Sequence, residues 1–386
     1  MPSRRPVSPR ARMPRARPAR SAARSQLIRV AVLALRDSTA LVPIGFADLL
    51  RKAVQLAATL PASGARPRLQ VQLVACGSAP VVVGASGIRV HCDATTRSLR
   101  RCDVVLVPSL EPDLAQHLAE NRDVVAWVRR MHDRGADVVS ACTGAFVLGE
   151  AGLLDGRTAT THWAFQDLLR QRYPRVRVRP EATVVDEGSV CTAGGATSFL
   201  NLALYLIERW LGADVARLAS KVFLVDVNKS PQTAYAILDG QRSHADAQIL
   251  RAQGLLEADL AAGSSVGELS EKIAMSRRTF VRRFTRATGT SPRDYLQRVR
   301  IEAAKRALEG TRRSVGSIAA GIGYNDPVAF RKLFARLTGL TPADYRRRYG
   351  GVGAVRAVTL QRRGGRAQRF GRAGRNQVAV ARHQAH

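Results

Sequence analysis

One cysteine stands where a strand-like segment turns directly into a helix-like one. In ADVVSACTGAFVLGEAGLL, residues 136–154, an apolar run ends at Cys142, and Thr143-Gly144-Ala145 leads at once into the next apolar segment. Such a turn places a thiol beside the unpaired N–H groups of a helix start, a position that lowers a cysteine pKa and binds anions. The pattern predicts either a pocket-lining or redox-sensitive thiol or a catalytic nucleophile.

His162 is the nearest side chain in the sequence that could act as a base for Cys142. It lies in the stretch TTHW, residues 160–163. An imidazole here either contacts a ligand or makes a structural hydrogen bond beside the neighbouring tryptophan. The candidate ligand-pocket residues are therefore Cys142, Thr143 and His162.

Two arginine-rich segments carry a different chemistry. MSRRTFVRRFTRATG, residues 275–289, and NDPVAFRKLFARLTG, residues 325–339, each begin with a residue that can cap a helix and carry two phenylalanines four positions apart, which would face a core. Arginine contacts guanine through two hydrogen bonds and also binds phosphates, so the outward rows suit a DNA major groove, although a solvated basic helix face is the alternative. The expected DNA-binding residues are Arg277, Arg278, Arg282, Arg283, Arg331 and Lys332.

These segments belong to an internal repeat. RRFTRATGTSPRDY, residues 282–295, recurs as KLFARLTGLTPADY, residues 332–345, and an offset of 49 residues becomes 50 between the first and second helix of each copy. An extra residue is tolerated there only in a turn, so each copy is predicted to be a helix-turn-helix. Residues 294–310 between the copies have the composition of one continuous helix. Its expected buried stripe is Leu296, Val299, Ala303 and Ala307.

Residues 246–349 resemble the DNA-binding domain of the AraC family of transcription regulators. The resemblance is carried by MSRRTFVRRFTRATGTSPRDYLQRVRIEAAKRAL and by IAAGIGYNDPVAFRKLFARLTGLTPADYRRRY. It implies an all-α domain with two helix-turn-helix units that bind DNA. The chain departs from the family at Pro327-Val328, where many relatives carry polar residues, which implies that the first unit dominates sequence choice.

The segment 26–212 alternates strand-like and helix-like stretches. LIRVAVLAL is followed by FADLLRKAVQLAATL, then by RLQVQLVA, and, after a polar segment, by CDVVLVPS. This rhythm predicts an α/β domain with a parallel sheet and helices on both faces. The expected fold is thus an α/β N-terminal domain plus an all-α C-terminal domain with two helix-turn-helix units.

The first domain resembles the PfpI-type, glutamine-amidotransferase-like fold. The resemblance rests on the turn at Cys142, on LLDGRTATTHW and on TAGGATSFLNLAL. It implies a nucleophilic cysteine at Cys142, usually followed by a histidine, with an acidic residue near the end of the first strand. This chain has Thr143 and apparently Val42 at those places, so the standard means of activating the thiol is missing and no catalytic residue is expected.

Positive charge is concentrated in parts of the chain. Of the formal net charge of +31, the segments 1–25 and 351–386 supply +16, because each holds eight arginines and no acidic residue. Much of the rest falls in residues 246–350, and the first domain is almost neutral. The expected organisation is a basic disordered tail (1–25), a sensor domain (26–212), a linker (213–245), the DNA-binding domain (246–350) and a second basic disordered tail (351–386).

Cysteine usage and hydropathy narrow the cellular setting. Five cysteines without a CxxC pair suggest a reducing cytoplasm, and no apolar run is long enough to span a membrane. His91, Cys92 and Cys102 lack the spacing of a metal site, so neither a metal nor a cofactor is expected.

The combined patterns favour a cytoplasmic transcription regulator whose first domain senses a small molecule. Its expected partners are double-stranded promoter DNA, a small-molecule effector and a second copy in a homodimer, with RNA polymerase as a further candidate. The alternatives are a PfpI-like cysteine hydrolase or amidase that also binds nucleic acid and, with less support, a nonspecific DNA-packaging protein.

Overall fold

The computed structural model describes residues 27–350 except 37, 62–64, 112, 196, 227–230, 236–243, 259 and 262–264. The two arginine-rich tails predicted at residues 1–25 and 351–386 lie outside the described residues. Among the helices that are described, none is both long enough and apolar enough to cross a bilayer.

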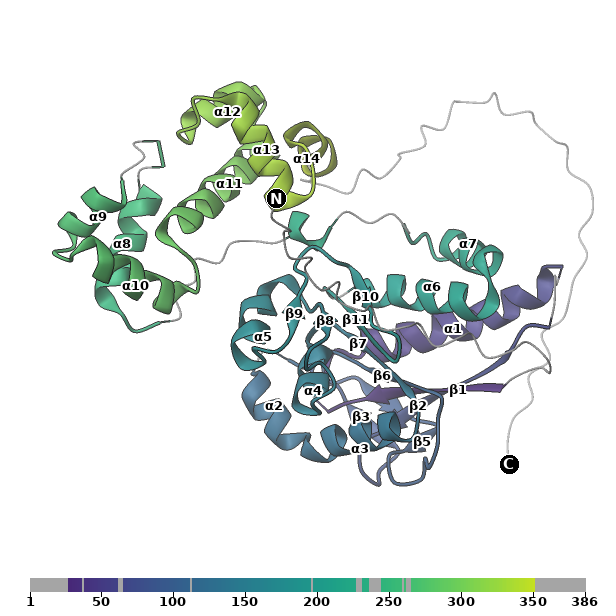
Figure 1. The fold of residues 1–386 in the computed structure, drawn as a ribbon. Coiled ribbons are helices and arrows are strands. Elements are labelled where there is room, and N and C mark those ends of the chain that lie inside the picture. Colours follow the sequence, from purple (N-terminus) through teal and green to yellow (C-terminus); the bar gives the residue numbers. More distant parts are fainter. Residues whose placement is uncertain are drawn as a thin grey trace, which may run out of the picture. The chain divides into compact units, whose positions relative to one another are not determined.

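A seven-stranded sheet forms the centre of the first domain (Figure 1). Its strand order is β10-β11-β7-β6-β1-β2-β5, and all neighbours are parallel except β10 and β11, so the predicted parallel sheet is confirmed with one antiparallel edge strand. The strands are β1 (Leu27–Ala34), β2 (Arg68–Ala75), β5 (Ala94–Thr95), β6 (Val104–Val107), β7 (Asp137–Ala141), β10 (Val184–Asp186) and β11 (Val190–Ala193).

Helices cover both faces of this sheet because its central strands are apolar on both sides. In β1, Val30 and Val32 belong to one core and Ala31 and Leu33 to the other, as alternation along a strand requires. One face packs against α1 (Leu41–Thr59), α6 (Ser198–Leu211) and α7 (Ala213–Val222), and the other against α2 (Leu114–Glu120), α3 (Arg122–Asp133), α4 (Ala145–Glu150) and α5 (Gln166–Arg172) (Figure 1).

Short elements complete the α/β domain at its ends. Among the described residues, two small sheets pair β3 with β4 and β8 with β9, and three 3-10 turns occur. These elements are β3 (Val81–Val83), β4 (Arg89–His91), β8 (Thr158–Ala159), β9 (Arg177–Val178), η1 (Cys142–Gly144), η2 (Trp163–Phe165) and η3 (Gln232–Ala234).

The α/β domain extends beyond its expected end at residue 212 to include helix α7. Val215, Ala216 and Ala219 are buried in the same core as α1 and α6. They form an apolar stripe of helical period, which fixes the helix to the domain. Residues 213–222, expected to open the linker, therefore belong to the α/β domain; the polar sequence that suggested a linker begins only at Asp226.

The helical domain contains two small cores that share one long helix. Tyr295 and Val299 of that helix, α11, belong to the first core, whereas Ile301, Ala304 and Leu308 belong to the second. The helices are α8 (Ala247–Ala258), α9 (Val266–Lys272), α10 (Arg277–Thr288), α11 (Pro292–Gly310), α12 (Val315–Gly321), α13 (Pro327–Thr338) and α14 (Pro342–Tyr349).

The two copies of the repeat have the predicted helix-turn-helix form. Four residues separate α9 from α10, whereas five separate α12 from α13, so the extra residue of the second copy lies in the turn. Both turns pass through the left-handed region, at Ala274 with φ 54° and at Gly323 with φ 84°. The predicted caps are confirmed, since Ser276 accepts a hydrogen bond from the Thr279 N–H and Asp326 from the Val328 N–H.

The buried face of α11 differs from the predicted stripe. Of the four residues expected there, Val299 is buried, whereas Leu296, Ala303 and Ala307 are only partly buried. A helix that serves two cores buries residues on more than one face, so a single stripe does not describe it. The pair Glu302 and Lys305, joined at 2.9 Å, is also buried.

Candidate ligand site and DNA interface

The turn after β7 holds Cys142 in a strained backbone conformation. Strand β7 ends at Ala141, η1 begins at Cys142, and the cysteine adopts φ 57°, which is unusual for a residue with a side chain. Gly144 allows the turn to approach β6, because a Cβ there would lie 2.5 Å from the Pro108 carbonyl oxygen. The predicted strand-to-helix turn is therefore present, with the thiol at its first residue.

Burial determines the protonation of the Cys142 thiol. The residue is 7% exposed, and removal from water raises the pKa of its thiol to about 11; hydrogen bonds from the backbone and side chain of Thr143 oppose the rise, and the charge of Glu111 adds to it. The expectation that this position lowers the pKa is wrong, because desolvation outweighs the N–H groups of a short helix. At neutral pH the residue is a thiol rather than a thiolate.

Thr143 ties the turn to the segment that follows β6. Its hydroxyl donates to the Leu110 carbonyl oxygen at 2.6 Å and accepts from the Leu110 N–H at 2.8 Å. The residue is 2% exposed, so its hydroxyl is engaged and hidden from a ligand. Thr143 therefore holds the turn in place, and its role as a ligand-pocket residue stays a prediction.

Glu111 supplies a carboxylate that the sequence analysis missed. Val42, at the position where an acidic residue was sought, is buried in α1. Glu111 instead comes from the segment after β6, accepts a hydrogen bond from the Thr39 hydroxyl at 3.3 Å and raises the pKa of Cys142. The sequence could have indicated Glu111, because it follows a buried strand and so lies at the edge of the sheet where α/β proteins bind ligands.

His162 lies at the same edge of the sheet. Its Nδ1 accepts a hydrogen bond from the Ala164 N–H at 3.2 Å, and burial lowers its pKa, so the neutral ring carries its hydrogen on Nε2. The imidazole ring lies 5.0 Å from the Trp163 ring, centroid to centroid. A Cβ at Gly195 would lie 3.9 Å from His162 Nε2, so this nitrogen is close to the backbone after β11.

The structure gathers these residues because β7 and β11 are neighbours. Ala141 and Ala193 are paired at the ends of the two strands, so Cys142 after β7 lies beside Gly194 and Gly195 after β11. The Thr161 hydroxyl donates to the Cys142 carbonyl oxygen at 2.8 Å and links the two segments. We call Cys142, Thr161, His162 and Gly195 the elbow site. Among the described residues, no hydrogen bond joins the Cys142 thiol to the His162 ring.

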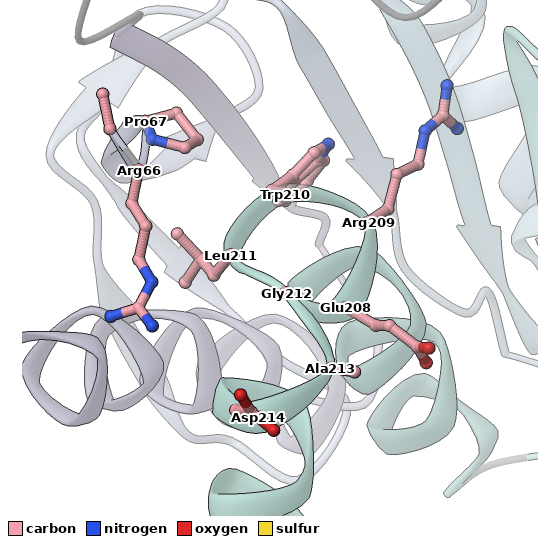
Figure 2. Close-up of a pocket in the computed structure, with 10 residues that line it drawn as sticks. Arg66, Pro67, Glu208, Arg209, Trp210, Leu211, Gly212, Ala213 and Asp214 are labelled. Atoms are coloured by element: carbon pink, nitrogen blue, oxygen red, sulfur yellow. The ribbon is translucent and has the colours of Figure 1, made fainter. Parts of the chain in front are cut away.

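Two open surface pockets lie away from the elbow site. One, of about 430 Å³, adjoins the turn between α6 and α7; Figure 2 shows Arg66 and Pro67 on one side of it and Glu208 and Arg209 on the other. The second, of about 570 Å³, is lined by residues of α2, α3, α4 and α5. Neither pocket includes a residue of the elbow site. In the part of the chain described, no group of three metal-ligating side chains comes together.

Most of the predicted DNA-binding side chains are exposed on the second helix of each unit. On α10, Arg277, Arg278 and Arg282 are exposed, and on α13 the same holds for Arg331 and Lys332. The phenylalanines of both helices are fully buried, so the basic residues face away from the cores. Val328 at the start of α13 is 54% exposed, which leaves an apolar side chain at the position where the sequence departs from the family.

Arg283 has a different environment from its neighbours. Its guanidinium donates to both Asp246 carboxylate oxygens, at 2.7 and 3.0 Å, and to the Gln248 side chain at 2.8 Å. The two-pronged geometry is the strong form of a charge-assisted hydrogen bond, and the Arg283 bond lowers the pKa of Asp246. Arg283 fastens α10 to the start of α8, and its contact with DNA stays a prediction.

An α/β domain followed by two helix-turn-helix units suits a DNA-binding regulator, and comparison with known proteins supports this class. A model of the DJ-1/PfpI family matches residues 53–209, and a model of a helix-turn-helix domain matches residues 269–348. The chain is 30% identical over 238 residues to the HTH-type transcriptional regulator Rv1931c of Mycobacterium tuberculosis, across 54% of this chain and 82% of that protein. The chain belongs to the family of AraC-type HTH transcriptional regulators that carry a DJ-1/PfpI domain.

Two further proteins are similar to this chain, and one of them is an enzyme. The HTH-type transcriptional regulator CdhR of Pseudomonas aeruginosa is 28% identical over 253 residues, which cover 65% of this chain and 74% of CdhR. Isonitrile hydratase of Pseudomonas putida is 35% identical over 156 residues, which cover 39% of this chain and 64% of the enzyme. The first domain is therefore similar both to regulators and to an enzyme.

Proposed function

We propose that this protein regulates transcription by binding promoter DNA in a sequence-specific manner, under the control of a small molecule sensed by its first domain. The pair of capped helix-turn-helix units, each with exposed basic residues on its second helix, carries the proposal. Such helices suit the major groove, where arginine distinguishes guanine from the other bases. Membership of a family of transcriptional regulators supports the same function.

The first domain is proposed to be a sensor without enzymatic activity. A nucleophilic cysteine needs a thiolate or an adjacent base, whereas burial keeps Cys142 protonated and Thr143 replaces the usual histidine. A ligand at the elbow site controls transcription only if it binds one state of the protein more tightly than another. Catalytic turnover is not required for that response.

The alternative function is a PfpI-like cysteine hydrolase or amidase that also binds nucleic acid. The observation that favours it is the likeness of the first domain to isonitrile hydratase. Glu111, which raises the pKa of Cys142, and His162 of the elbow site also offer a carboxylate and an imidazole that could serve as acid and base once a substrate is bound.

The partners proposed for the regulator are promoter DNA, a small-molecule effector, a second copy in a homodimer, and RNA polymerase. The proposed location is the cytoplasm. The proposed partners rest on the family. The proposed location rests on the five cysteines, which form no disulfide among the described residues and therefore suit a reducing compartment.

A comparison of wild type with Cys142→Ser separates the two functions. DNA binding is measured on the DNA upstream of the gene that encodes this protein, with scrambled DNA as competitor. Turnover is measured on amides, esters and isonitriles. A regulator keeps specific DNA binding in both proteins and shows no turnover. Steady wild-type turnover that is lost in Cys142→Ser would establish the enzyme, and equal affinity for both DNAs would reject sequence-specific regulation.

A further inference from the structure

A glutamine from outside the α/β sheet is buried beside the elbow site. Gln232 lies in η3, which follows α7 and precedes the first helix of the DNA-binding domain in the sequence, and only 4% of the residue is exposed. A glutamine side chain loses considerable conformational freedom on burial, so such burial requires compensating contacts. The surroundings of its carboxamide supply them.

Both ends of the Gln232 carboxamide are recognised by the first domain. Its Nε2 donates to the Thr160 hydroxyl at 2.8 Å, the Thr161 carbonyl oxygen at 3.0 Å and the Ala182 carbonyl oxygen at 3.0 Å, and its Oε1 accepts from the Gly195 N–H at 3.3 Å. The Thr160 hydroxyl donates to Ala182, so it is free to accept from Gln232. The two N–H groups of the carboxamide are shared among three acceptors, and its carbonyl oxygen accepts from the one donor, so the surroundings satisfy both ends of this group.

The shape of this site also depends on the carboxamide. A Cβ at Gly194 would lie 2.5 Å from Gln232 Oε1 and 2.8 Å from Nε2, so only a glycine leaves room for the amide plane. The next residue, Gly195, supplies the N–H for Oε1 and borders His162. Thr161 contacts Gln232 through its carbonyl and Cys142 through its hydroxyl. The carboxamide site therefore shares two residues with the elbow site.

We propose that Thr160, Thr161, Ala182, Gly194 and Gly195 form a binding site for a primary carboxamide, and that Gln232 is its built-in ligand. By filling the site, Gln232 anchors residues 231–235 to the first domain. The backbone N–H of Gln232 strengthens this attachment by donating to the Glu181 carbonyl oxygen at 3.3 Å. A small molecule that presents a carboxamide to these same groups competes with this anchor. The site thus links ligand occupancy in the first domain to the segment that precedes the DNA-binding domain.

Hydrogen exchange of the full-length protein tests the anchor directly. In Gln232→Ala, the Gly195 N–H loses its acceptor and residues 231–235 lose the side-chain part of their attachment, so exchange of peptides covering both regions is expected to rise about tenfold or more. Thr233→Ala is the matched control, because it alters the same segment and leaves the carboxamide contacts in place. Equal exchange in Gln232→Ala and wild type would overturn the proposal.

Chemical rescue tests the specificity for a carboxamide. Acetamide at about 100 mM, a concentration suited to a ligand of few atoms, replaces the atoms that the substitution removes and is expected to restore protection at Gly195 in Gln232→Ala. Acetate has the same size but offers no N–H to the Thr161 and Ala182 carbonyls, so it is expected to fail. Failure of acetamide, or equal rescue by acetate, would show that the pocket does not recognise a carboxamide.

The link to DNA binding rests on the proposed function and is tested separately. If the anchor matters for regulation, Gln232→Ala should change the affinity for the specific DNA at least severalfold, whereas Thr233→Ala should not. Loss of specific binding already in wild type would reject the proposed function while the exchange result stands. Specific binding that is identical in all three proteins would reject the link between the anchor and DNA.

Discussion

Arg278 and Arg282 differ from Arg283 in what their guanidinium groups can reach. The first two are exposed and lie four residues apart on the same side of α10, whereas Arg283 is held by Asp246. We predict that Arg278→Ala or Arg282→Ala weakens binding to the specific DNA by about 1–3 kcal/mol and reduces the preference over scrambled DNA. Competition binding measures both quantities.

Arg283→Ala serves as the control for that prediction. It should lower the thermal stability of the helical domain, because it leaves Asp246 without its partner, while affecting both DNAs alike. If the first two variants lose affinity equally for specific and scrambled DNA, those arginines contact phosphates rather than bases.

The reactivity of Cys142 is a second property of a single residue. Alkylation requires the thiolate, and a pKa of about 11 rather than 9.0 reduces the thiolate fraction at pH 8 by about a hundredfold. The sign follows from burial, which favours the neutral thiol, so the rate should rise as the pH approaches 11. Mass spectrometry of the Cys142 peptide after iodoacetamide treatment measures it, with denatured protein as the control. Rapid alkylation of the native protein at pH 7.5 would indicate an activated thiol.

At the scale of elements, the caps of the two second helices stabilise the units that present the arginines. Ser276 and Asp326 each accept a hydrogen bond from an N–H of the first turn. We predict that Ser276→Ala and Asp326→Ala each lower the free energy of unfolding by about 1 kcal/mol. Urea unfolding provides the measurement. Thr285→Ala, at an exposed position within α10, is the control and should be neutral or slightly stabilising, because alanine favours helix.

At the scale of the whole molecule, charge outside the two domains should govern nonspecific affinity. The segments 1–25 and 351–386 contain sixteen arginines and no acidic residue. Because each neutralised phosphate releases counterions, their removal should weaken binding to every DNA and make the salt dependence of the affinity less steep. Titrations at several salt concentrations test this. An unchanged slope would mean that the segments do not contact DNA, and loss of sequence preference would contradict their nonspecific role.

The proposed homodimer is the second property of the whole molecule. The first domain is almost neutral, so two copies can associate without strong repulsion. Light scattering at micromolar concentration is expected to give two chains per particle, both without DNA and, once the mass of the DNA is subtracted, with it. A single-chain mass in both conditions would contradict the dimer.

The sequence by itself determined the features that depend on neighbouring residues. Caps such as Ser276 and Asp326 bond to N–H groups two or three positions away, and the alternation in β1 and the phenylalanine spacing in α10 are local periods. The doubled helix-turn-helix also followed from the sequence, because an insertion in a repeat must fall in a turn.

Only the tertiary structure decided what depends on contacts between distant residues. Arg283 meets Asp246, which lies 37 positions earlier, and Gln232 reaches Thr160 across 72 positions. The pKa of Cys142 is set by how completely neighbouring elements exclude water, and the buried faces of α11 are set by the two cores it joins. No local pattern encodes these contacts, because they exist only when the separate segments are packed together.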